Sequence, residues 1–492
     1  MQNPPPLSFN MAAYVLSQAQ LRADHPALIV PGLHVWTYAA LERAVRGLAT
    51  GLLGRASPGD HVLLRLGNTP DFPITYLACI AAGLIPVPTS SQLTVPEVDK
   101  MAAELRPALI VQAGGVAAPS GSWPVLAQLD LAALQTLPPA DYAMGDPNRP
   151  AYIVYTSGTS GHARAVVHAH RAIWARRMMW DGWYGLTQDD RLLHAGAFNW
   201  TYTLGTGLMD PWSIGATAII PRDGTDASAL PALMAAHHAT IFAAAPGVYR
   251  RMLRQPMPAI PSLRHGLSAG EKLPEPLRAA WQDQTGTAIY EAFGMSECST
   301  FISGSPQRPA PAGALGYPQP GRQIALIGAD GPSDAGQIAI HRSDPGLMLG
   351  YFGQPQDTAA RYAGDWFLTG DEATRDASGA ITYAGRADDM MNAGGTRVSP
   401  GEVEAILARH PGITEVACAE VRVSSTLTLI AAFYTGPDVI DDGALGKFAG
   451  AHLAAYKVPR IYVHRSALPR GANNKLLRRA LRTEWEAAHG QA

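Results

Sequence analysis

Cysteine is scarce in this 492-residue sequence, and no long apolar run is present. The three cysteines, Cys79, Cys298 and Cys418, lie far apart and form no CxxC pair. This spacing excludes a disulfide framework and a cysteine-rich zinc site, and it suits a reducing compartment. The apolar stretch around residues 76–87 is too short and too often interrupted by Gly and Pro to span a bilayer. The N-terminal residues MQNPPPLSFN carry no basic segment followed by an apolar one, so no signal peptide is expected. A cytoplasmic location is the resulting expectation.

The sequence also lacks an excess of charge of either sign. It contains 38 Lys and Arg residues and 40 Asp and Glu residues, which gives a formal net charge of −2. Neither nucleic acid nor an anionic membrane is therefore expected as a partner. Hydrophobic residues make up 47% and charged residues 16%, a balance typical of a folded chain rather than a disordered one. The length is too great for one hydrophobic core and predicts a large domain together with a smaller one.

Helix-like and strand-like segments alternate along much of residues 1–260. Short β-like runs occupy residues 61–65, 85–88, 108–112, 151–155, 216–221 and 240–244, with helical patterns such as 41–51 and 71–83 between them. This rhythm predicts an α/β fold built from βαβ units with largely parallel sheets.

The pattern changes from about Gly313, where shorter strands and frequent Gly turns predict a small barrel-like section. After Asp388 the pattern indicates a compact α+β segment. Its predicted elements are helices at 401–410 and 475–488 and strands at 416–421 and 426–433. We therefore expect an N-terminal domain of residues 1–387 and a C-terminal domain of residues 388–492.

A loop rich in hydroxyl groups and glycine follows the apolar strand at 151–155. It consists of Thr156, Ser157, Gly158, Thr159, Ser160 and Gly161. Glycines let backbone N–H groups turn toward phosphate oxygens, and the hydroxyl groups can donate further hydrogen bonds. The loop is not a Walker A motif, because no Gly-Lys-Ser/Thr sequence is present. Taken alone, such a hexapeptide is more often an ordinary turn.

Four further motifs follow this loop along the chain. They are residues 293–297 (FGMSE), 366–371 (WFLTGD), 385–389 (GRADD) with 394–397 (GGTR) and 402–404 (EVE), and 469–475 (PRGANNK). In this order, the motifs resemble those of the acyl-adenylate-forming superfamily, the AMP-dependent synthetases and ligases. Medium-chain acyl-CoA synthetases and benzoate–CoA-ligase-like enzymes are the most similar branches. The resemblance covers about residues 150–480, and five ordered matches make it specific.

The resemblance implies an acid–CoA ligase that works in two steps. ATP activates a carboxylic acid as acyl-AMP with release of pyrophosphate, and CoA then displaces AMP to form a thioester. ATP and CoA are the implied co-substrates, and Mg²⁺ held through Glu297 is the implied metal. The C-terminal domain is expected to be mobile between the two steps, with Asp388 at the hinge.

The resemblance also assigns roles to individual residues. The ATP and AMP site is expected to comprise Thr156, Ser157, Gly158, Thr159, Ser160, Gly161, Arg164, Gly270, Glu271, Phe293, Asp371, Arg386 and Arg397. Ser296, Glu297 and Lys475 are the expected catalytic residues, with Lys475 bridging the substrate carboxylate and the α-phosphate. Arg164 stands where the family usually has Lys, and a solvated loop charge is an equal alternative for it. Asn474 replaces the usual Gly before the catalytic lysine.

Other candidate sites receive simpler interpretations. Gly395 is expected to border the tunnel for the thiol arm of CoA, although a role in shaping a Gly-Gly turn is an alternative. The histidines after the phosphate loop, among them His168 and His170, supply only half of a zinc shell, so no metal is expected there. Cys298 has no identifiable activating histidine and is expected to be a packing residue.

The acid itself is expected to lie in an apolar pocket. Its predicted lining residues are Phe198, Trp200, Tyr202, Ala244, Ala245, Gly247, Ser268 and Gly294. Gly294 stands where acetyl-CoA synthetases carry Trp, so the pocket has room for more than acetate. No acidic residue is evident that would bind an amino group, which disfavours an amino acid. A medium-chain, branched or aryl carboxylic acid is therefore expected, within fatty-acid or aromatic-acid metabolism.

Other functions remain as alternatives. An adenylating enzyme could pass the acyl group to a carrier protein or an amine, and the CoA dependence of product formation would separate these cases. A luciferase-type oxidoreductase would require oxygen. A nucleotide-binding protein without turnover is disfavoured by the presence of Glu297, Asp371 and Lys475. The sequence leaves the exact acid and the oligomeric state open, with a homodimer among the possibilities.

Overall fold

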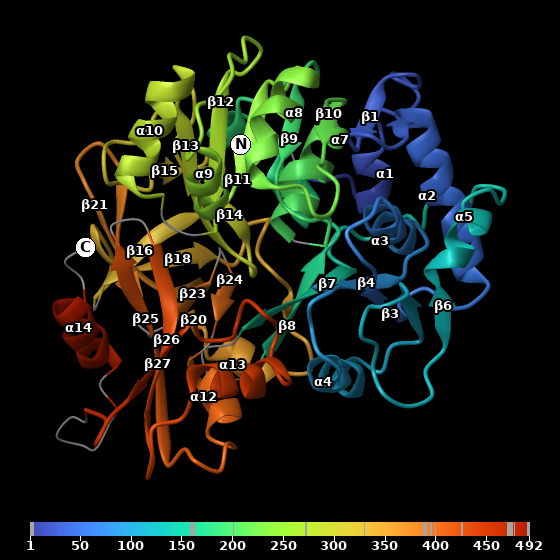
Figure 1. The fold of residues 1–492 in the computed structure, drawn as a ribbon. Coiled ribbons are helices and arrows are strands. Elements are labelled where there is room, and N and C mark those ends of the chain that lie inside the picture. The colour runs from blue at the N-terminus through green and yellow to red at the C-terminus, as the bar shows by residue number, and fades with distance from the viewer. Residues whose placement is uncertain are drawn as a thin grey trace.

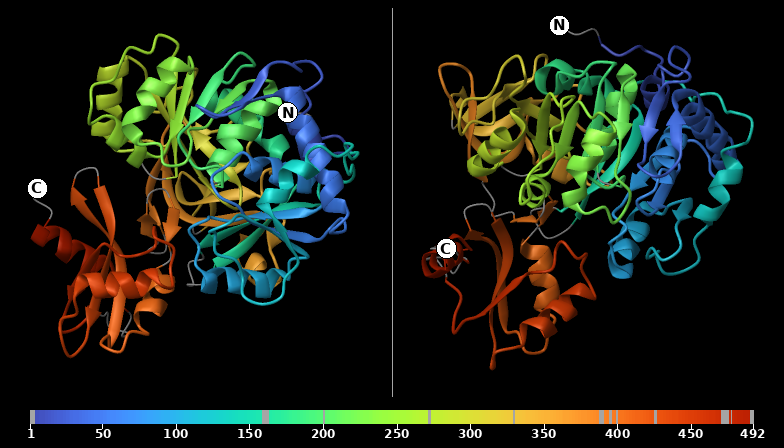
Figure 2. Two further views of the ribbon diagram at one scale, coloured as in Figure 1. Left: turned by 45° about the vertical axis from the view of Figure 1, so that its right-hand side comes forward. Right: turned by 45° about the horizontal axis from the view of Figure 1, so that its top comes forward.

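The computed structural model describes residues 4–157, 163–199, 201–270, 273–328, 330–386, 391–393, 396–398, 400–424, 427–469, 476 and 478–489. Most of the chain forms a large N-terminal part made of several sheets and their helices (Figure 1). The C-terminal segment, coloured orange to red, forms a smaller lobe beside it in both further views (Figure 2). This arrangement confirms the predicted mixed α/β class with a large N-terminal and a smaller C-terminal unit. The predicted boundary at 387–388 itself falls outside the described residues.

The largest sheet has nine strands in the order β15-β14-β13-β12-β11-β9-β10-β1-β2. Their bounds are β15 (Tyr317–Pro318), β14 (Ser299–Ser303), β13 (Ile289–Met295), β12 (His265–Ala269), β11 (Ile241–Ala244), β9 (Arg191–His194), β10 (Thr217–Ile219), β1 (Pro26–Ile29) and β2 (Val35–Thr37). The strands from β13 to β1 run parallel, and the sheet's edges are antiparallel. Parallel strands have their carboxyl ends at one edge of the sheet, where α/β proteins bind ligands.

A second sheet is wholly parallel and has the order β4-β3-β5-β6. Its strands are β4 (Ile85–Pro88), β3 (His61–Arg65), β5 (Leu109–Gln112) and β6 (Val125–Ala127). The predicted βαβ pattern is confirmed here, because α3 (Asp71–Ala81) connects β3 to β4 and α4 (Val95–Leu105) connects β4 to β5. The predicted strand at 151–155 behaves differently. As β7 (Pro150–Ser157) it pairs antiparallel with β8 (Ala163–Ala169), which in turn pairs with β19 (Gly350–Tyr351).

The predicted barrel-like section is a six-stranded antiparallel sheet. It contains β16 (Ile324–Gly328), β17 (Gly331–Ser333), β18 (Ala335–His341), β20 (Tyr362–Ala363), β21 (Trp366–Arg375) and β22 (Ile381–Arg386). The smaller lobe contains the hairpin β23 (Met391–Ala393) and β24 (Thr396–Val398) and the sheet of β25 (Glu415–Ser424), β26 (Leu427–Thr435) and β27 (Ile461–His464). Its helices are α12 (Pro400–Leu407), α13 (Asp442–Gly450) and α14 (Arg478–His489). These bounds agree with the predicted α+β segment to within a few residues.

Helix positions follow from apolar spacing and from caps. In α2 (Tyr38–Leu53), Leu41, Val45, Leu48 and Leu52 are buried, which gives the helix one apolar face. A capping box in which Thr94 and Glu97 bond each other's backbone begins α4. The other helices of the N-terminal part are α1 (Met11–Val15), α5 (Leu131–Leu134), α6 (Ala172–Arg176), α7 (Asp210–Ile214), α8 (Leu230–Ala236), α9 (Pro246–Met252), α10 (Glu275–Thr285) and α11 (Pro355–Ala359), with π-helical turns η2 (Trp180–Tyr184) and η3 (Thr203–Met209) and 3₁₀ turns η1 (Gln128–Asp130) and η4 (Ala227–Ala229).

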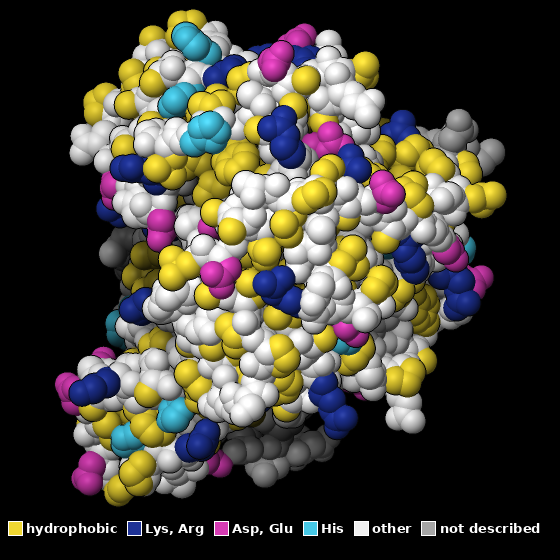
Figure 3. Space-filling model, turned by 90° about the vertical axis from the view of Figure 1, so that its right-hand side faces the viewer, with side chains coloured by type: hydrophobic (Ala, Val, Ile, Leu, Met, Phe, Trp, Pro, Cys, Tyr) yellow, Lys and Arg dark blue, Asp and Glu magenta, His cyan; other side chains and the backbone are white. Residues whose placement is uncertain are grey.

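Helices α8 to α10 cover one side of the nine-stranded sheet. Tyr249 and Trp281 from these helices pack against Phe242 of β11. On the face shown in Figure 3, basic and acidic side chains are interspersed and form no single-sign patch. Within the described part of the chain, no helix combines the length and apolar character needed to cross a bilayer.

Candidate active site

A cavity of about 1000 Å³ lies where the N-terminal part meets the smaller lobe. Residues of β7, β8, η3, α9 and the β13–β14 hairpin form its wall on the N-terminal side. The hairpin β23–β24, strand β26 and residues 456–460 complete the wall on the C-terminal side. The cavity therefore depends on both parts of the chain.

The predicted catalytic pair Ser296 and Glu297 lies in the turn between β13 and β14, and both residues line the cavity. One oxygen of Glu297 accepts a hydrogen bond of 2.9 Å from the hydroxyl of Tyr351. The carbonyl oxygen of Ser296 lies 2.7 Å from Nε2 of His168, which must donate because a carbonyl can only accept. Burial lowers the pKa of His168 to about 4, so this imidazole is neutral near pH 7. The two contacts fix the turn that carries the catalytic motif.

The phosphate-loop candidates are described at the two ends of the loop. Thr156 and Arg164 are direct partners in the β7–β8 register, and both line the cavity. The side chain of Ser157, and residues Gly158, Thr159, Ser160 and Gly161, lie outside what the structure describes. The guanidinium carbon of Arg164 lies 4.9 Å from the centre of the Tyr351 ring, and one nitrogen lies 3.8 Å from Asp357. Only 15% of this side chain is exposed, so Arg164 is not the solvated loop charge of the alternative interpretation.

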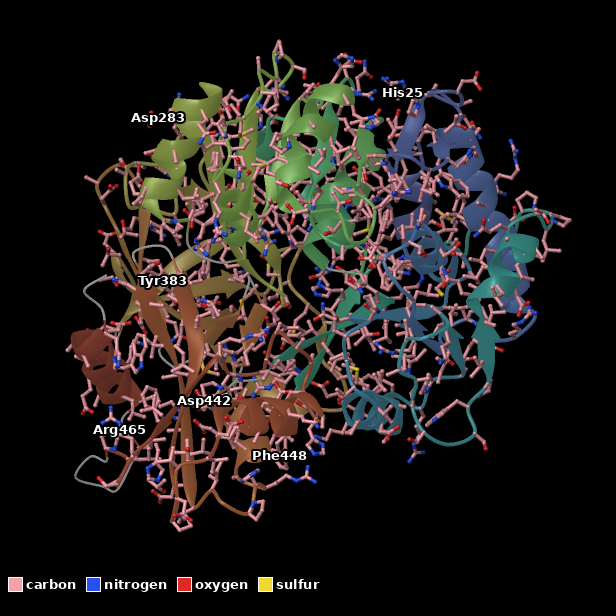
Figure 4. The ribbon with its side chains drawn as sticks, in the orientation of Figure 1. His25, Asp283, Tyr383, Asp442, Phe448 and Arg465 are labelled. Carbon is pink, nitrogen blue, oxygen red and sulfur yellow. The ribbon has the colours of Figure 1, made fainter. Side chains whose placement is uncertain are left out.

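The candidates for adenosine binding form a connected group that is not part of the described cavity lining. The ring of Phe293 lies 5.9 Å from that of Tyr383, and the Tyr383 hydroxyl donates to the buried Asp371 over 3.2 Å. Tyr383 lies on β22, beside the smaller lobe (Figure 4). Asp371 pairs with Arg386 in the β21–β22 register. The structure thus brings together Phe293 and Asp371, which the sequence assigned to adenine and ribose.

Gly270 lines the cavity with a positive φ of 98°, a conformation that favours glycine. Glu271 lies outside the described residues, as do Asp388, Gly395 and Lys475. The side chains of Arg386 and Arg397 are likewise not described. Asn392 and Thr396, which flank position 395, do line the cavity.

The acyl-pocket candidates divide into two groups. Tyr202, Gly247 and Gly294 lie on the cavity wall. By contrast, the described lining does not include Phe198, Ala244, Ala245 or Ser268, which are buried in the protein interior. Phe198 belongs to the main hydrophobic core, Ala244 is the last residue of the central strand β11, and Ser268 lies within β12. Trp200 falls outside the described residues.

Gly294 has a second role that the sequence did not reveal. A Cβ atom at this position would lie 2.2 Å from the carbonyl oxygen of Ser299 on the paired strand β14. Ser299 itself has a positive φ of 61°, which marks an irregular hairpin at this point. The close approach of the two strands therefore requires glycine at 294, whatever the size of the acid.

Polar side chains also line this cavity. Arg176, Asn199, Thr206, Ser299 and Thr300 lie on its wall together with Tyr202. Because the same cavity holds the phosphate-loop and catalytic residues, the apolar lining expected for the acid itself stays a prediction. These residues come from segments far apart in the chain, and no motif marks them as neighbours. Their only sequence signal is that polar residues follow the FGMSE motif directly.

Basic residues gather at the mouth of the cavity. Arg250, Arg251 and Arg254 of the α9 region line it on one side, and Arg460 lines it on the other. Lys457 lines it as well, but its charge is balanced by Glu97 and Glu402. Such a group of cations favours phosphate-bearing ligands at the mouth. No sequence motif marks these residues, because arginines on a short helix have the same pattern as an ordinary exposed helix face.

The remaining histidine and cysteine candidates have structural partners. His170 accepts a hydrogen bond of 3.0 Å from the backbone N–H of Met11, whereas His168 serves the Ser296 turn. Cys298 is buried, its Sγ lies 2.8 Å from a nitrogen of Arg322, and burial raises the pKa of its thiol. These contacts fit the expected packing role of Cys298. No group of three potential metal ligands among His, Cys, Asp and Glu occurs in the described ranges.

Comparisons with known proteins agree with this site. The family model for AMP-binding enzymes matches residues 15–352, and that for the AMP-binding enzyme C-terminal domain matches residues 402–475. A benzoate–CoA ligase of Thauera aromatica is 30% identical, with 87% of this chain and 86% of that protein covered. A 3-hydroxybenzoate–CoA ligase of Aromatoleum sp. (strain CIB) is 29% identical, with 94% of each covered. The solved structure of a benzoate–CoA ligase from Burkholderia xenovorans LB400 is 27% identical, covers 96% of this chain and 100% of that one, and gives a TM-score of 0.71.

The chain therefore belongs to the family of AMP-binding enzymes, which confirms the resemblance to the acyl-adenylate-forming superfamily. Within that family, its relatives are AMP-forming acid–CoA ligases, and the predicted class of acid–CoA ligation through an acyl-adenylate is confirmed. Enzymes of this class use ATP and CoA as substrates together with a carboxylic acid.

Proposed function

We propose that this protein is an aryl carboxylic acid–CoA ligase. The observation that carries the proposal is that one cavity joins the phosphate-loop residues Thr156 and Arg164, the catalytic turn at Ser296 and Glu297, and the C-terminal hairpin β23–β24. The named activities of the two relatives, toward benzoate and 3-hydroxybenzoate, support an aromatic acid. Tyr202 on the pocket wall and Gly247 facing open space are compatible with a flat ring.

In the first step, a carboxylate oxygen of the acid attacks the α-phosphorus of ATP. The bond between that phosphorus and the bridging oxygen breaks, and pyrophosphate leaves. Thr156, Arg164 and residues 157–161 would hold the departing phosphates, and Ser296 would donate to the α-phosphate. Lys475 would stabilise the negative charge that develops between carboxylate and phosphate. Phe293 would position the adenine and Asp371 the ribose. Arg386 and Arg397 would complete the nucleotide site.

Glu297 fits the proposed role as a Mg²⁺ ligand. Its carboxylate lines the cavity beside the catalytic turn, and the Tyr351 hydroxyl fixes one of its oxygens. A hard cation that binds oxygen and retains several waters suits a single carboxylate together with phosphate oxygens. Mg²⁺ bound there would neutralise charge on the phosphates.

In the second step, the CoA sulfur attacks the acyl carbonyl carbon, the carbon–oxygen bond to AMP breaks, and the thiol proton leaves to solvent. Arg250, Arg251, Arg254 and Arg460 at the mouth would attract the phosphates of CoA. Gly395 would border the path of the thiol arm, and Asn392 and Thr396 of the same motif region line the cavity. Asp388 would be the hinge of a C-terminal domain that begins there.

Pyrophosphate release tests the proposal. The protein is incubated with ATP and Mg²⁺ and a panel of aryl and aliphatic acids, each with and without CoA. Turnover that requires an aryl acid and yields its CoA thioester and AMP is the expected result. If the rate of product formation does not depend on CoA, the protein is instead an adenylating enzyme that passes the acyl group to a carrier protein or an amine. No pyrophosphate release with any acid would overturn the proposal.

A further inference from the structure

Arg176 and Asp210 form a buried ion pair at the side of the acyl pocket. Nε and Nη2 of Arg176 lie 2.8 Å and 2.6 Å from the two oxygens of Asp210. The Tyr184 hydroxyl donates to the same carboxylate over 2.7 Å, and Asp210 is only 1% exposed. Asp210 does not line the cavity, whereas Arg176 does. The carboxylate therefore neutralises the guanidinium from behind, and the Nη1 edge of Arg176 is the edge left for the cavity.

A guanidinium has five N–H groups, and those of Nη1 are not fully used by the described residues. The described contact of Nη1 is with the hydroxyl oxygen of Ser299, which accepts. Because that oxygen accepts, the Ser299 hydroxyl still has its own hydrogen to donate, and the described part of the chain offers it no acceptor. Both residues line the cavity. One N–H of Arg176 and the O–H of Ser299 therefore lie at the pocket, and neither has an acceptor among the described residues.

The position of these donors relates them to the reacting end of the acid. Ser299 is the direct partner of Met295 in the β13–β14 register, and Ser296 follows Met295 in the chain. Partners across an antiparallel pair have Cα atoms about 4.5–5.5 Å apart. Ser299 therefore lies directly across the hairpin from the strand end that leads into the catalytic turn. An acid whose carboxylate is at that turn would meet these donors with its ring, so an acceptor for them belongs on the ring.

We propose that Arg176 and Ser299 determine specificity for an aryl acid that carries a neutral oxygen substituent, such as a hydroxyl group, on its ring. The inference rests on the proposed function and names its substrate class more closely. An unsubstituted ring would strip water from both donors and give them no acceptor. A second carboxylate would bring an uncompensated charge, because Asp210 already balances Arg176.

The test compares kcat/KM for thioester formation with benzoate, 3- and 4-hydroxybenzoate, 3- and 4-methylbenzoate, and the corresponding dicarboxylates. For the wild-type protein, we expect at least one hydroxybenzoate to exceed benzoate and both methylbenzoates by about tenfold or more. The dicarboxylates should be poorer than that hydroxybenzoate.

Ser299→Gly is the informative variant, because glycine accepts the positive φ of this position and only the hydroxyl is lost. The ratio of kcat/KM for hydroxybenzoate to kcat/KM for benzoate should fall several-fold. Thr300→Val is the matched control: Thr300 lines the same pocket, but its hydroxyl already donates to the sulfur of Met179, so the ratio should be retained. Arg176 is left in place because its removal would leave Asp210 buried without a cation.

The outcomes separate the two proposals. Benzoate or methylbenzoate performing as well as the hydroxybenzoates would overturn this inference and leave the ligase intact. A preference for a dicarboxylate would overturn the claim that the recognised ring substituent is neutral. An unchanged ratio in folded Ser299→Gly, checked by its Tm, would overturn the role of Ser299. If that variant does not fold, the wild-type ranking alone decides. No activity with any acid would reject the proposed function itself.

Discussion

The Nζ of Lys457 lies 3.0 Å from Oε1 of Glu97, although 360 positions separate the two residues in the chain. Glu97 is in α4 of the N-terminal part, whereas Lys457 belongs to the smaller lobe and lies 2.8 Å from Glu402 of α12. The three side chains are at most 16% exposed. Burial disfavours charge on Lys457, but Tyr456, Glu402 and Glu97 together raise its pKa. This contact, and a hydrogen bond of 3.3 Å from Thr94 to the carbonyl of His452, join the two parts of the chain.

Glu97→Gln should weaken the arrangement in which β23–β24 lines the cavity. Glu402 would still balance Lys457, so no buried charge is left alone and the fold should survive. We expect thioester formation from supplied acyl-AMP and CoA to slow by about tenfold, equivalent to about 1.4 kcal/mol. Rapid-quench measurement of that half-reaction is the check. Glu275→Gln, on an exposed residue of α10, is the control, and an equal loss in both variants would contradict a joining role.

Local patterns in the sequence predicted much of the fold. The strands at 61–65 and 85–88 occur at those residues, because short apolar runs between helices leave few other structures. The pairing of β7 was not predictable in the same way. Its apolar pattern suits a parallel or an antiparallel neighbour, and the antiparallel register of seven residue pairs with β8 is known only from the structure.

Ser296 and Glu297 could be predicted as neighbours on one turn because motif residues are close in sequence, whereas the phosphate loop at 158–161 lies outside the described residues and stays a prediction. Arg176 and Ser299 are 123 positions apart, and only tertiary packing brings them together. Glu97 and Lys457 meet across two parts of the chain for the same reason. Arg250 and Arg460 could not be selected from the sequence, because they resemble ordinary surface charges until the cavity between the two parts is known.

Arg164→Lys tests whether the arginine at this family position depends on stacking. The planar guanidinium lies over the Tyr351 ring, whereas a lysine ammonium is a compact charge that is held less well there. A loss of about 1 kcal/mol of binding predicts a KM for ATP about fivefold higher, with little change in the KM of the acid. Steady-state kinetics provide both values.

Tyr351→Phe supplies the control for Arg164→Lys. It keeps the ring under Arg164 and removes only the hydroxyl that donates to Glu297. Because Glu297 is the proposed Mg²⁺ ligand, kcat of this variant should fall when Mg²⁺ is limiting. The fold increase in its KM for ATP should be smaller than that fold decrease in kcat. An unaltered KM for ATP in Arg164→Lys would contradict a stacking role.

Gly294→Ala should reduce activity with every acid rather than shift preference among acids. The added Cβ would meet the backbone of Ser299 and Thr300 at 2.2–2.5 Å, so the hairpin must move. Overpacking of this kind costs about 1–3 kcal/mol, which should be visible as a lowered Tm. Gly247→Ala is the matched control, because its added Cβ has no atom within 4 Å among the described residues and it also lines the cavity. A changed acid preference in Gly294→Ala at an unaltered Tm would show that pocket size, rather than strand pairing, requires this glycine.

Buried neutral histidines should make the protein lose stability as pH falls below 6.5. Burial lowers the pKa of His170 to about 3, from an ordinary value of 6.5. Between these values, the unfolded chain binds a proton that the folded chain does not. Stability is therefore fully present above pH 6.5 and decreases on acidification, by about 1.4 kcal/mol per pH unit for one such group.

His170→Asn removes this titration while its side-chain oxygen can still accept from the N–H of Met11. The Tm of this variant should fall less steeply than that of the wild type between pH 6.5 and pH 4.5. His34→Asn, on an exposed residue, should follow the wild-type curve. Parallel curves for all three proteins would mean that His170 binds its proton as readily in the folded protein as in the unfolded chain. That result would contradict the prediction, which rests on the burial of His170 and on the hydrogen bond that its Nδ1 accepts.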